Sequence, residues 1–177
     1  MKIHLQTERC IIRDIAEDDV EGMFALESNP NVHKFLGNQP ISTRDQAVEI
    51  IENILWQYKT FGIGRWAIED KVTHKFIGWT GFKREEKLRT DRVYIDIGYR
   101  LREKFWGKGL ATETALACLN YGFDTLNFEE VCGCADTDHK ASNAILRKIG
   151  LRCKEEFTFD GTPLHWYTLK KSEWKTM

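Results

Sequence analysis

A lysine between two glycines, Gly107-Lys108-Gly109, stands between an apolar segment and the start of an amphipathic one. Glycines let backbone N–H groups turn toward an anion without interference from a Cβ atom. The N-terminus of the helix expected to follow adds about half a positive charge. This loop therefore predicts a site that binds a phosphate-bearing ligand.

Two common nucleotide-binding motifs do not fit this loop. In a Walker A motif, Arg102 would have to be glycine, and Gly109 would have to be serine or threonine. A dinucleotide-binding fingerprint would need glycine at Thr112, and it would fall near the start of a βαβ chain rather than past its midpoint. An ordinary strand-to-helix turn remains the alternative for the loop taken alone.

Length and composition predict one soluble globular domain over residues 1–177, with room for a sizeable core. The chain is 42% hydrophobic and 30% charged, and its formal net charge of −1 gives no reason to expect a nucleic-acid partner. No apolar run approaches the roughly 18 residues that span a membrane, and the N-terminus lacks the apolar region of a signal peptide. We therefore expect no membrane partner and a cytoplasmic location.

The cysteines are expected to be reduced thiols, because their number is odd and they lie among apolar residues: Cys10, Cys118, Cys132, Cys134 and Cys153. Cys132 and Cys134, together with His139, offer a zinc interpretation. No second pair of cysteines accompanies them, and residues 131–135 have the composition of a buried strand. Packing thiols are favoured, and no metal site is predicted.

Hydrophobic periodicity predicts an α/β (α+β) fold. Apolar residues at helical spacing, together with capping signals, predict helices at about 18–27, 32–36 and 140–149. They predict a further helix that runs from a cap at Ser42 or Thr43 to about Tyr58, and another that runs from the glycine loop to Leu126. Apolar runs between turn residues predict strands at 7–13, 65–69, 76–83, 92–101, 128–135, 151–159 and 163–169. Polar linkers at 70–75 and 85–91 suit an antiparallel meander, and Asp160-Gly161 predicts a hairpin turn.

This order of elements resembles the GNAT acetyltransferase superfamily over nearly the whole chain, in particular the branch containing the ribosomal-protein-alanine N-acetyltransferases. Five segments carry the resemblance: Thr7-Glu8-Arg9-Cys10-Ile11-Ile12-Arg13, Asn29-Pro30-Asn31-Val32-His33-Lys34-Phe35-Leu36, Asp96-Ile97-Gly98-Tyr99-x-Leu101, Phe105-Trp106-Gly107-Lys108-Gly109-Leu110-Ala111-Thr112-Glu113 and Ala141-Ser142-Asn143-Ala144-Ile145-Leu146-Arg147-Lys148-Ile149-Gly150-Leu151. The resemblance implies a mixed, mostly antiparallel central sheet flanked by helices. Homodimers are common in this branch, although no residue pattern here indicates an interface.

The resemblance also implies that acetyl-CoA is the cosubstrate. Backbone N–H groups of the glycine loop would bind its pyrophosphate, and Trp106 stands where the family usually has Gln or Arg. The pantetheine arm would pair with the main chain at Tyr99 and Leu101, with His139 and Asn143 on its other side. His139 stands where the family often has Asn. The implied coenzyme-binding residues are Tyr99, Leu101, Lys104, Trp106, Gly107, Lys108, Gly109, Leu110, Ala111, Thr112, His139 and Asn143.

The chemistry implied is direct attack of an amine on the thioester. Keeping a lysine-like amine neutral at pH 7 costs about 4–5 kcal/mol, whereas an α-amine costs only about 1 kcal/mol. No strong base is evident, because strand alternation points Asp96 away from the side of Tyr99 and Leu101. This favours an amine of low pKa or a water relay. The resemblance points to Ser142 as the catalytic proton donor to the thiolate, with helix capping as the alternative role.

The acceptor is expected between the turn at 29–38 and the final hairpin, where Phe35, Phe159, His165 and Trp166 could wall a pocket. A protein or peptide N-terminus, a polyamine, an amino sugar and a drug-like amine all remain open as acceptors. Two other classes of function also stay open for the whole protein. One is a non-catalytic module that binds acyl-CoA, and the other is an interaction domain in which the glycine loop is merely structural.

Overall fold

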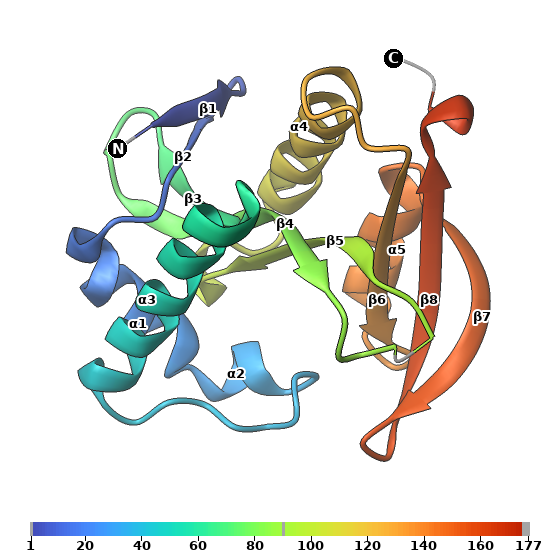
Figure 1. Cartoon of the computed structure of the whole chain (residues 1–177). Helices are drawn as coiled ribbons and strands as arrows, with labels where there is room; N and C mark the ends of the chain where they lie inside the picture. The colour runs from blue at the N-terminus through green and yellow to red at the C-terminus, as the bar shows by residue number, and fades with distance from the viewer. Residues whose placement is uncertain (1, 90, 175–177) are drawn as a thin grey trace.

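The computed structural model describes residues 2–89 and 91–174 and builds them around one eight-stranded sheet (Figure 1). The strands, in chain order, are β1 (Ile3–Gln6), β2 (Cys10–Arg13), β3 (Arg65–Asp70), β4 (Phe76–Glu85), β5 (Tyr94–Leu101), β6 (Glu130–Asp136), β7 (Arg152–Phe159) and β8 (Thr162–Lys170). Their order across the sheet is β1-β2-β3-β4-β5-β6-β8-β7. Neighbouring strands are antiparallel except β5 and β6, which run parallel. The expected mixed, mostly antiparallel sheet is confirmed.

Helices cover both faces of this sheet. They are α1 (Val20–Glu27), α2 (Pro30–His33), α3 (Arg44–Phe61), α4 (Leu110–Asp124) and α5 (Lys140–Lys148), with short 3₁₀ turns η1 (Glu17–Asp19), η2 (Glu103–Phe105) and η3 (Lys171–Glu173). In Figure 1, α3 lies in front of the sheet and α5 behind it. No helix within residues 2–89 and 91–174 is both long and apolar enough to cross a bilayer.

Two hydrophobic clusters separate the faces of the sheet. The larger one joins α4 and α5 to strand residues such as Ile68, Phe82 and Ile97. The smaller one joins α1 and α3 to Ala67 and Phe76 on the opposite face. Since side chains alternate along a strand, β3 and β4 supply both clusters. We call these two sides the α4 face and the α3 face.

The prediction of a helix at 32–36 is wrong in its position. α2 spans Pro30–His33, because the Asn29 side chain accepts a hydrogen bond from the N–H of Asn31 at 2.8 Å and Pro30 takes the first helical position. The residues that follow form turns, with Gly37 and Asn38 at positive φ.

The first predicted strand also begins later than expected. Residues 7–9 form a turn in which the Thr7 N–H donates to the Cys10 carbonyl at 2.9 Å, so β2 starts at Cys10. β1, which the pattern analysis did not predict, pairs with β2 at the edge of the sheet. Residue 90 of the expected turn at 85–91 lies outside the described residues.

Candidate active site

β5 and β6 separate from one another at their carboxyl ends, and this opening organises the site. The two parallel strands are in register only at Asp96 opposite Cys132. Beyond that position β5 continues to Leu101 paired with β4, and β6 continues to Asp136 paired with β8. Figure 1 shows the two strands diverging. The facing edges therefore present backbone groups that an extended ligand can pair with.

The glycine loop lies between the end of β5 and the start of α4. Gly107 and Gly109 adopt φ values of 71° and 77°, and Gly109 is the N-cap of α4 without any side-chain cap. Within the described residues, no backbone N–H from Gly107 to Thr112 donates to a protein acceptor. Free N–H groups at a helix N-terminus are an arrangement that can bind an anion, and the phosphate-binding role of this loop stays a prediction.

Two side chains far apart in the sequence support the loop. Arg9 Nη1 donates to the carbonyl of Lys108 at 2.8 Å, and Arg9 Nε donates to Glu113 Oε2 at 2.7 Å. The N–H of Arg9 also donates to Glu113 Oε1 at 3.0 Å. Arg9 and Glu113 both lie in segments that carried the family resemblance, but nothing local in the sequence indicates that they touch.

The other predicted residues of the loop surround it. Trp106 Nε1 donates to the carbonyl of Leu101 at 2.7 Å, which ties the loop to the last residue of β5. The ammonium groups of Lys104 and Lys108 lie 5.2 and 5.6 Å from the ring centroid of Phe105. The positive charges of Arg102, Lys75 and Lys108 lower the pKa of the exposed Lys104. The region of the loop is thus positively charged.

Tyr99 and Ser142 meet across the opening. The Tyr99 hydroxyl donates to the backbone carbonyl of Ser142 at 3.0 Å and lies 3.2 Å from Ser142 Oγ. Burial raises the pKa of Tyr99, so the phenol keeps its proton at neutral pH. Ser142 is not the cap of α5: the N-cap is His139, and no side chain caps this helix.

Asn143 is placed at the opening, but its side chain is fully engaged within the protein. Asn143 Nδ2 donates to the carbonyls of Asp136 and His139 at 2.8 and 2.9 Å. Its Oδ1 accepts from His165 Nδ1 at 2.8 Å and from the Tyr167 hydroxyl at 2.7 Å. A primary amide has two N–H donors and two lone pairs on its oxygen, so no polar atom of this side chain is left for a ligand. Asn143 therefore positions α5, β6 and β8.

Asp96 points to the α3 face, as strand alternation predicts. Its carboxylate pairs with Arg65, whose Nη1 also donates to the carbonyls of Gly81 at 2.6 Å and Asp96 at 3.0 Å. Burial raises the pKa of Asp96, while the Arg65 charge opposes that shift. With a guanidinium on its carboxylate, Asp96 is occupied as an ion-pair partner.

The four aromatic residues expected to wall an acceptor pocket do not come together. Trp166 is 3% exposed and packs with Tyr94 and Phe157, whereas the neighbouring His165 is on the other side of β8, at Asn143. Phe159 lies at the end of β7, 41% exposed. Phe35 meets the site from the other side, where its ring stacks on His139 with centroids 4.4 Å apart. Burial lowers the pKa of His139.

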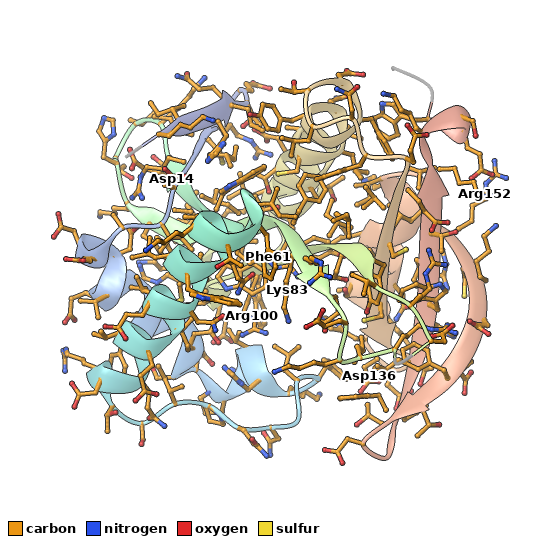
Figure 2. The ribbon with its side chains drawn as sticks, in the orientation of Figure 1. Asp14, Phe61, Lys83, Arg100, Asp136 and Arg152 are labelled. Atoms are coloured by element: carbon orange, nitrogen blue, oxygen red, sulfur yellow. The ribbon has the colours of Figure 1, made fainter. Side chains whose placement is uncertain are left out.

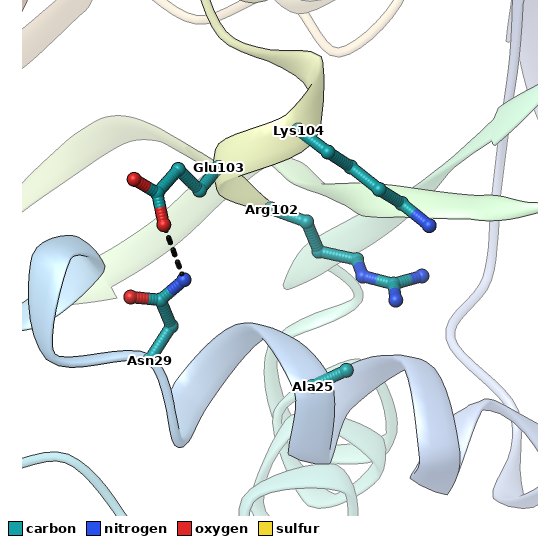
Figure 3. Close-up of a pocket in the computed structure, with 5 residues that line it drawn as sticks. All are labelled: Ala25, Asn29, Arg102, Glu103 and Lys104. Atoms are coloured by element: carbon teal, nitrogen blue, oxygen red, sulfur yellow. Dashed lines mark hydrogen bonds between the residues drawn. The ribbon is translucent and has the colours of Figure 1, made fainter.

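A hollow of about 420 Å³ lies beside the end of β5, lined by Ala25, Asn29, Arg102, Glu103 and Lys104 (Figure 3). Glu103 accepts hydrogen bonds from the side-chain amides of Asn29 and Asn31, both at 2.8 Å. These contacts, together with the Phe35–His139 stack, hold the α2 segment between η2 on one side of the opening and the start of α5 on the other.

Cys132 and Cys134 belong to the packing of the sheet. Cys132 is buried against Tyr94 and Trp166, with Cys134 at the edge of the same cluster. Burial raises the pKa of Cys132 to about 12, so its thiol stays protonated. Across residues 2–89 and 91–174, no group of three or more His, Cys, Asp or Glu side chains is arranged to hold a metal ion.

Comparison with known proteins identifies this architecture. The family model described as "Acetyltransferase (GNAT) domain" matches residues 9–152. The uncharacterized N-acetyltransferase YoaA of Bacillus subtilis is 32% identical over 148 residues, covering 84% of this chain and 82% of the relative. A GNAT-family acetyltransferase structure from Bacillus anthracis superposes with a TM-score of 0.81 at 21% identity, covering 98% of this chain and 100% of the other.

A third similar protein has been solved with coenzyme bound. RimL, a ribosomal L7/L12 alpha-N-protein acetyltransferase solved in complex with coenzyme A, gives a TM-score of 0.81 at 15% identity, covering 97% of this chain and 99% of the other. At this identity the likeness shows the fold alone, and the family assignment stands on the domain match and on YoaA. The chain belongs to the GNAT acetyltransferase family, whose reaction is the transfer of an acetyl group from acetyl-CoA to an amine.

Proposed function

We propose that this protein acetylates the α-amine of a protein or peptide N-terminus, with acetyl-CoA bound in the opening between β5 and β6. The observation that carries the proposal is the alignment of three features: free N–H groups at the glycine loop, unpaired edges of β5 and β6, and the two hydroxyls at Tyr99 and Ser142. They offer, in order along the opening, partners for a diphosphate, a pantetheine arm and a thioester sulfur.

In this proposal the coenzyme is bound mostly by main-chain groups. N–H groups from Gly107 to Thr112 receive the diphosphate, with Lys104 and Lys108 adding positive charge nearby. The N–H of Trp106 already donates to the Glu103 carbonyl at 2.9 Å. The main chain at Tyr99 and Leu101 pairs with the pantetheine amides, and His139 borders the arm from the α5 side. The side chain of Asn143 acts indirectly, by holding the first turn of α5 in place.

The reaction requires a neutral amine and a proton for the leaving thiolate. The amine nitrogen attacks the thioester carbonyl carbon, a C–N bond forms, and the C–S bond breaks. The attacking nitrogen loses one proton, and the CoA sulfur gains one. The Ser142 hydroxyl would supply the proton to sulfur and regain one from the attacking nitrogen through water. Because the Tyr99 hydroxyl donates to the Ser142 carbonyl, the Ser142 hydrogen points to the Tyr99 oxygen and would turn from it to the sulfur.

An α-amine needs little help from a base at this site. At pH 7 it becomes neutral for about 1 kcal/mol, against about 4–5 kcal/mol for a lysine-like amine. Asp96, the carboxylate on β5 near the opening, is held by Arg65. A small-molecule amine such as a polyamine, an amino sugar or a drug is the alternative acceptor. Because free thiols persist in reducing compartments, we place the reaction in the cytoplasm.

The test is an amine panel with acetyl-CoA as donor and free CoA thiol as the readout. The panel contains a peptide with a free N-terminus, the same peptide with its N-terminus blocked, spermidine and glucosamine. We expect the free peptide to release thiol fastest at pH 7 and the blocked peptide to release none. A clear preference for spermidine at neutral pH would contradict the proposed acceptor.

A further inference from the structure

A buried carboxylate gathers three side chains on the α3 face of the sheet. Glu27, the last residue of α1, is 2% exposed. It accepts hydrogen bonds from Trp79 Nε1 at 3.2 Å and from His33 Nε2 at 3.0 Å, and it pairs with Arg100 Nη1. We call Glu27, His33, Trp79 and Arg100 the Glu27 cluster. A carboxylate has only acceptor atoms, so all three partners donate to it.

Arg100 is fixed in place but retains free donors. Its Cζ lies 5.0 Å from the ring centroid of Trp79, and its Nη1 is held by Glu27. A guanidinium carries five N–H donors in a rigid plane. Among the described residues, only Nη1 of Arg100 has a hydrogen-bond partner, and the side chain is 22% exposed. Several aligned N–H groups thus remain available at a site that packing has already made rigid.

The position of Arg100 relates it to the reacting atoms. It stands between Tyr99 and Leu101, whose side chains pack into the cluster on the α4 face. Strand alternation therefore directs Arg100 to the α3 face, where Figure 2 shows it near the middle of the molecule, beside α3. In the proposed function the coenzyme reaches the opening from α4 and α5, so the amine has to approach the thioester from the α3 face.

The charges on this face match an acceptor that offers oxygen atoms. The carboxylates of Glu27, Asp96 and Glu85 are paired with Arg100, Arg65 and Lys83 respectively. The second ammonium of a polyamine would find each of these carboxylates already occupied. A carbonyl oxygen, in contrast, would find the free N–H groups of Arg100.

From this arrangement we infer that Arg100 is a specificity-determining residue that binds the carbonyl oxygen adjacent to the acceptor amine. It thereby selects α-amino acyl compounds, such as peptide N-termini, over simple alkylamines. This inference rests on the proposed function and names the chemical group that the same site recognises. Glu27 and Trp79 act as positioning residues, because they hold the guanidinium and do not touch the acceptor.

The experiment compares alaninamide with isopropylamine. Both place the amine on a carbon that bears a methyl group, and only alaninamide has a carbonyl beside it. The kcat/KM values are expressed per neutral amine, which removes the difference between the pKa values of the two amines. In the wild-type protein we expect alaninamide to be preferred. Arg100→Lys keeps a charge near Glu27 but loses the planar array of donors. It should lower the preference for alaninamide about tenfold, with isopropylamine little changed.

A second variant and a control protect the comparison against misfolding. Arg100→Gln combined with Glu27→Gln removes both charges together, so neither is left buried alone; it should lose the preference as Arg100→Lys does. Arg84→Lys changes another β4–β5 hairpin arginine, one that pairs with the exposed Glu86, and should keep the wild-type preference.

Equal loss on both amines, or an unchanged ratio in both Arg100 variants, would overturn the role of Arg100 while leaving α-amine acetylation intact. A wild-type protein that acetylates neither alaninamide nor a free peptide N-terminus would overturn the proposed function and this inference together.

Discussion

The hydroxyl oxygens of Tyr99 and Ser142 lie 3.2 Å apart, although the two residues are separated by 43 positions in the chain. Tyr99 comes from β5 and Ser142 from the first turn of α5, so their contact bridges the opening between the strands. The Tyr99 hydrogen is directed to the Ser142 carbonyl at 3.0 Å. The Ser142 hydrogen then points to the Tyr99 oxygen, from which it can turn to a ligand atom that enters between the two hydroxyls.

Ser142→Ala should therefore lower kcat about a hundredfold while leaving the Kd for CoA unchanged, as expected when a positioned proton donor is removed. Tyr99→Phe should have a smaller effect, because it removes only the group that orients Ser142. Initial rates with a peptide acceptor measure kcat, and calorimetric titration with CoA measures Kd. Full turnover by Ser142→Ala with intact CoA binding would exclude the proton-donor role.

The glycine loop gives a second prediction, about coenzyme affinity. Gly107 has a φ of 71°, and a Cβ atom there would meet nothing within 4 Å. Gly107→Ala therefore introduces backbone strain without a steric clash. An alanine in this region of φ costs about 1 kcal/mol, so the loop should shift away from its free N–H arrangement. We expect the Kd for CoA to rise about fivefold.

A matched control exists in the β7–β8 hairpin. Gly161 has a φ of 76°, and a Cβ atom there would also meet nothing within 4 Å. Gly161→Ala should lower the free energy of unfolding by a similar amount and leave the Kd for CoA unchanged. If both variants weakened CoA binding equally, the effect of Gly107→Ala would reflect lost stability rather than a phosphate-binding loop.

Local sequence signals account for much of the fold. α3 was predictable because Thr43 and Gln46 form a capping box and Ala47, Ile51 and Ile54 repeat on one face. The glycine loop and the strand before it were predictable for the same reason: spacing within a few residues determines them. α2 was misplaced by a few residues because Val32 and Leu36 suggested helical spacing, whereas Asn29 and Pro30 set the start of the helix.

The support of the site could not be predicted in this way. Arg9 and Glu113 meet although they are 104 positions apart, and Glu27 and Arg100 meet across 73 positions. Neither pair has a local pattern, because the partners come together only when the sheet forms. The side chain of Asn143, whose polar atoms are all hydrogen-bonded within the protein, could not be predicted either. Its place in the chain indicates nearness to the coenzyme, but its hydrogen bonds are decided by β6 and β8.

A third prediction concerns stability. Glu27→Ala removes a buried carboxylate and leaves the Arg100 charge without its partner, which should lower the free energy of unfolding by about 3 kcal/mol. Glu21→Ala is the control, since Glu21 pairs with Arg44 through side chains that are 65% and 62% exposed. Exposed pairs contribute little to stability, because water and salt screen them. Urea denaturation at pH 7 compares the two variants. Similar losses of unfolding free energy would show that the Glu27 cluster stabilises the protein no more than a surface ion pair does.

The last prediction concerns pH and depends on His139, whose ring stacks on Phe35. Burial lowers the pKa of His139 in the folded protein, and the nearby Asp136 carboxylate opposes the shift. In the unfolded chain the imidazole takes a proton near its ordinary pKa of about 6.5. As pH falls below that value the unfolded state binds more protons than the folded state, so this residue's contribution to stability is lost. Above about pH 7 both states hold it neutral, and the contribution is constant.

His139→Asn tests this prediction, because asparagine keeps a planar polar group at the N-cap and cannot titrate. The difference in unfolding free energy between wild type and variant should be constant from pH 7 to 8 and should shrink as the pH falls from 6.5 to 5. A single titrating group changes that difference by at most about 1.4 kcal/mol per pH unit. Urea denaturation curves at half-unit steps measure it. If the two proteins lost stability in parallel down to pH 5, His139 would have the same pKa in both states, and the stack on Phe35 would not depend on its protonation.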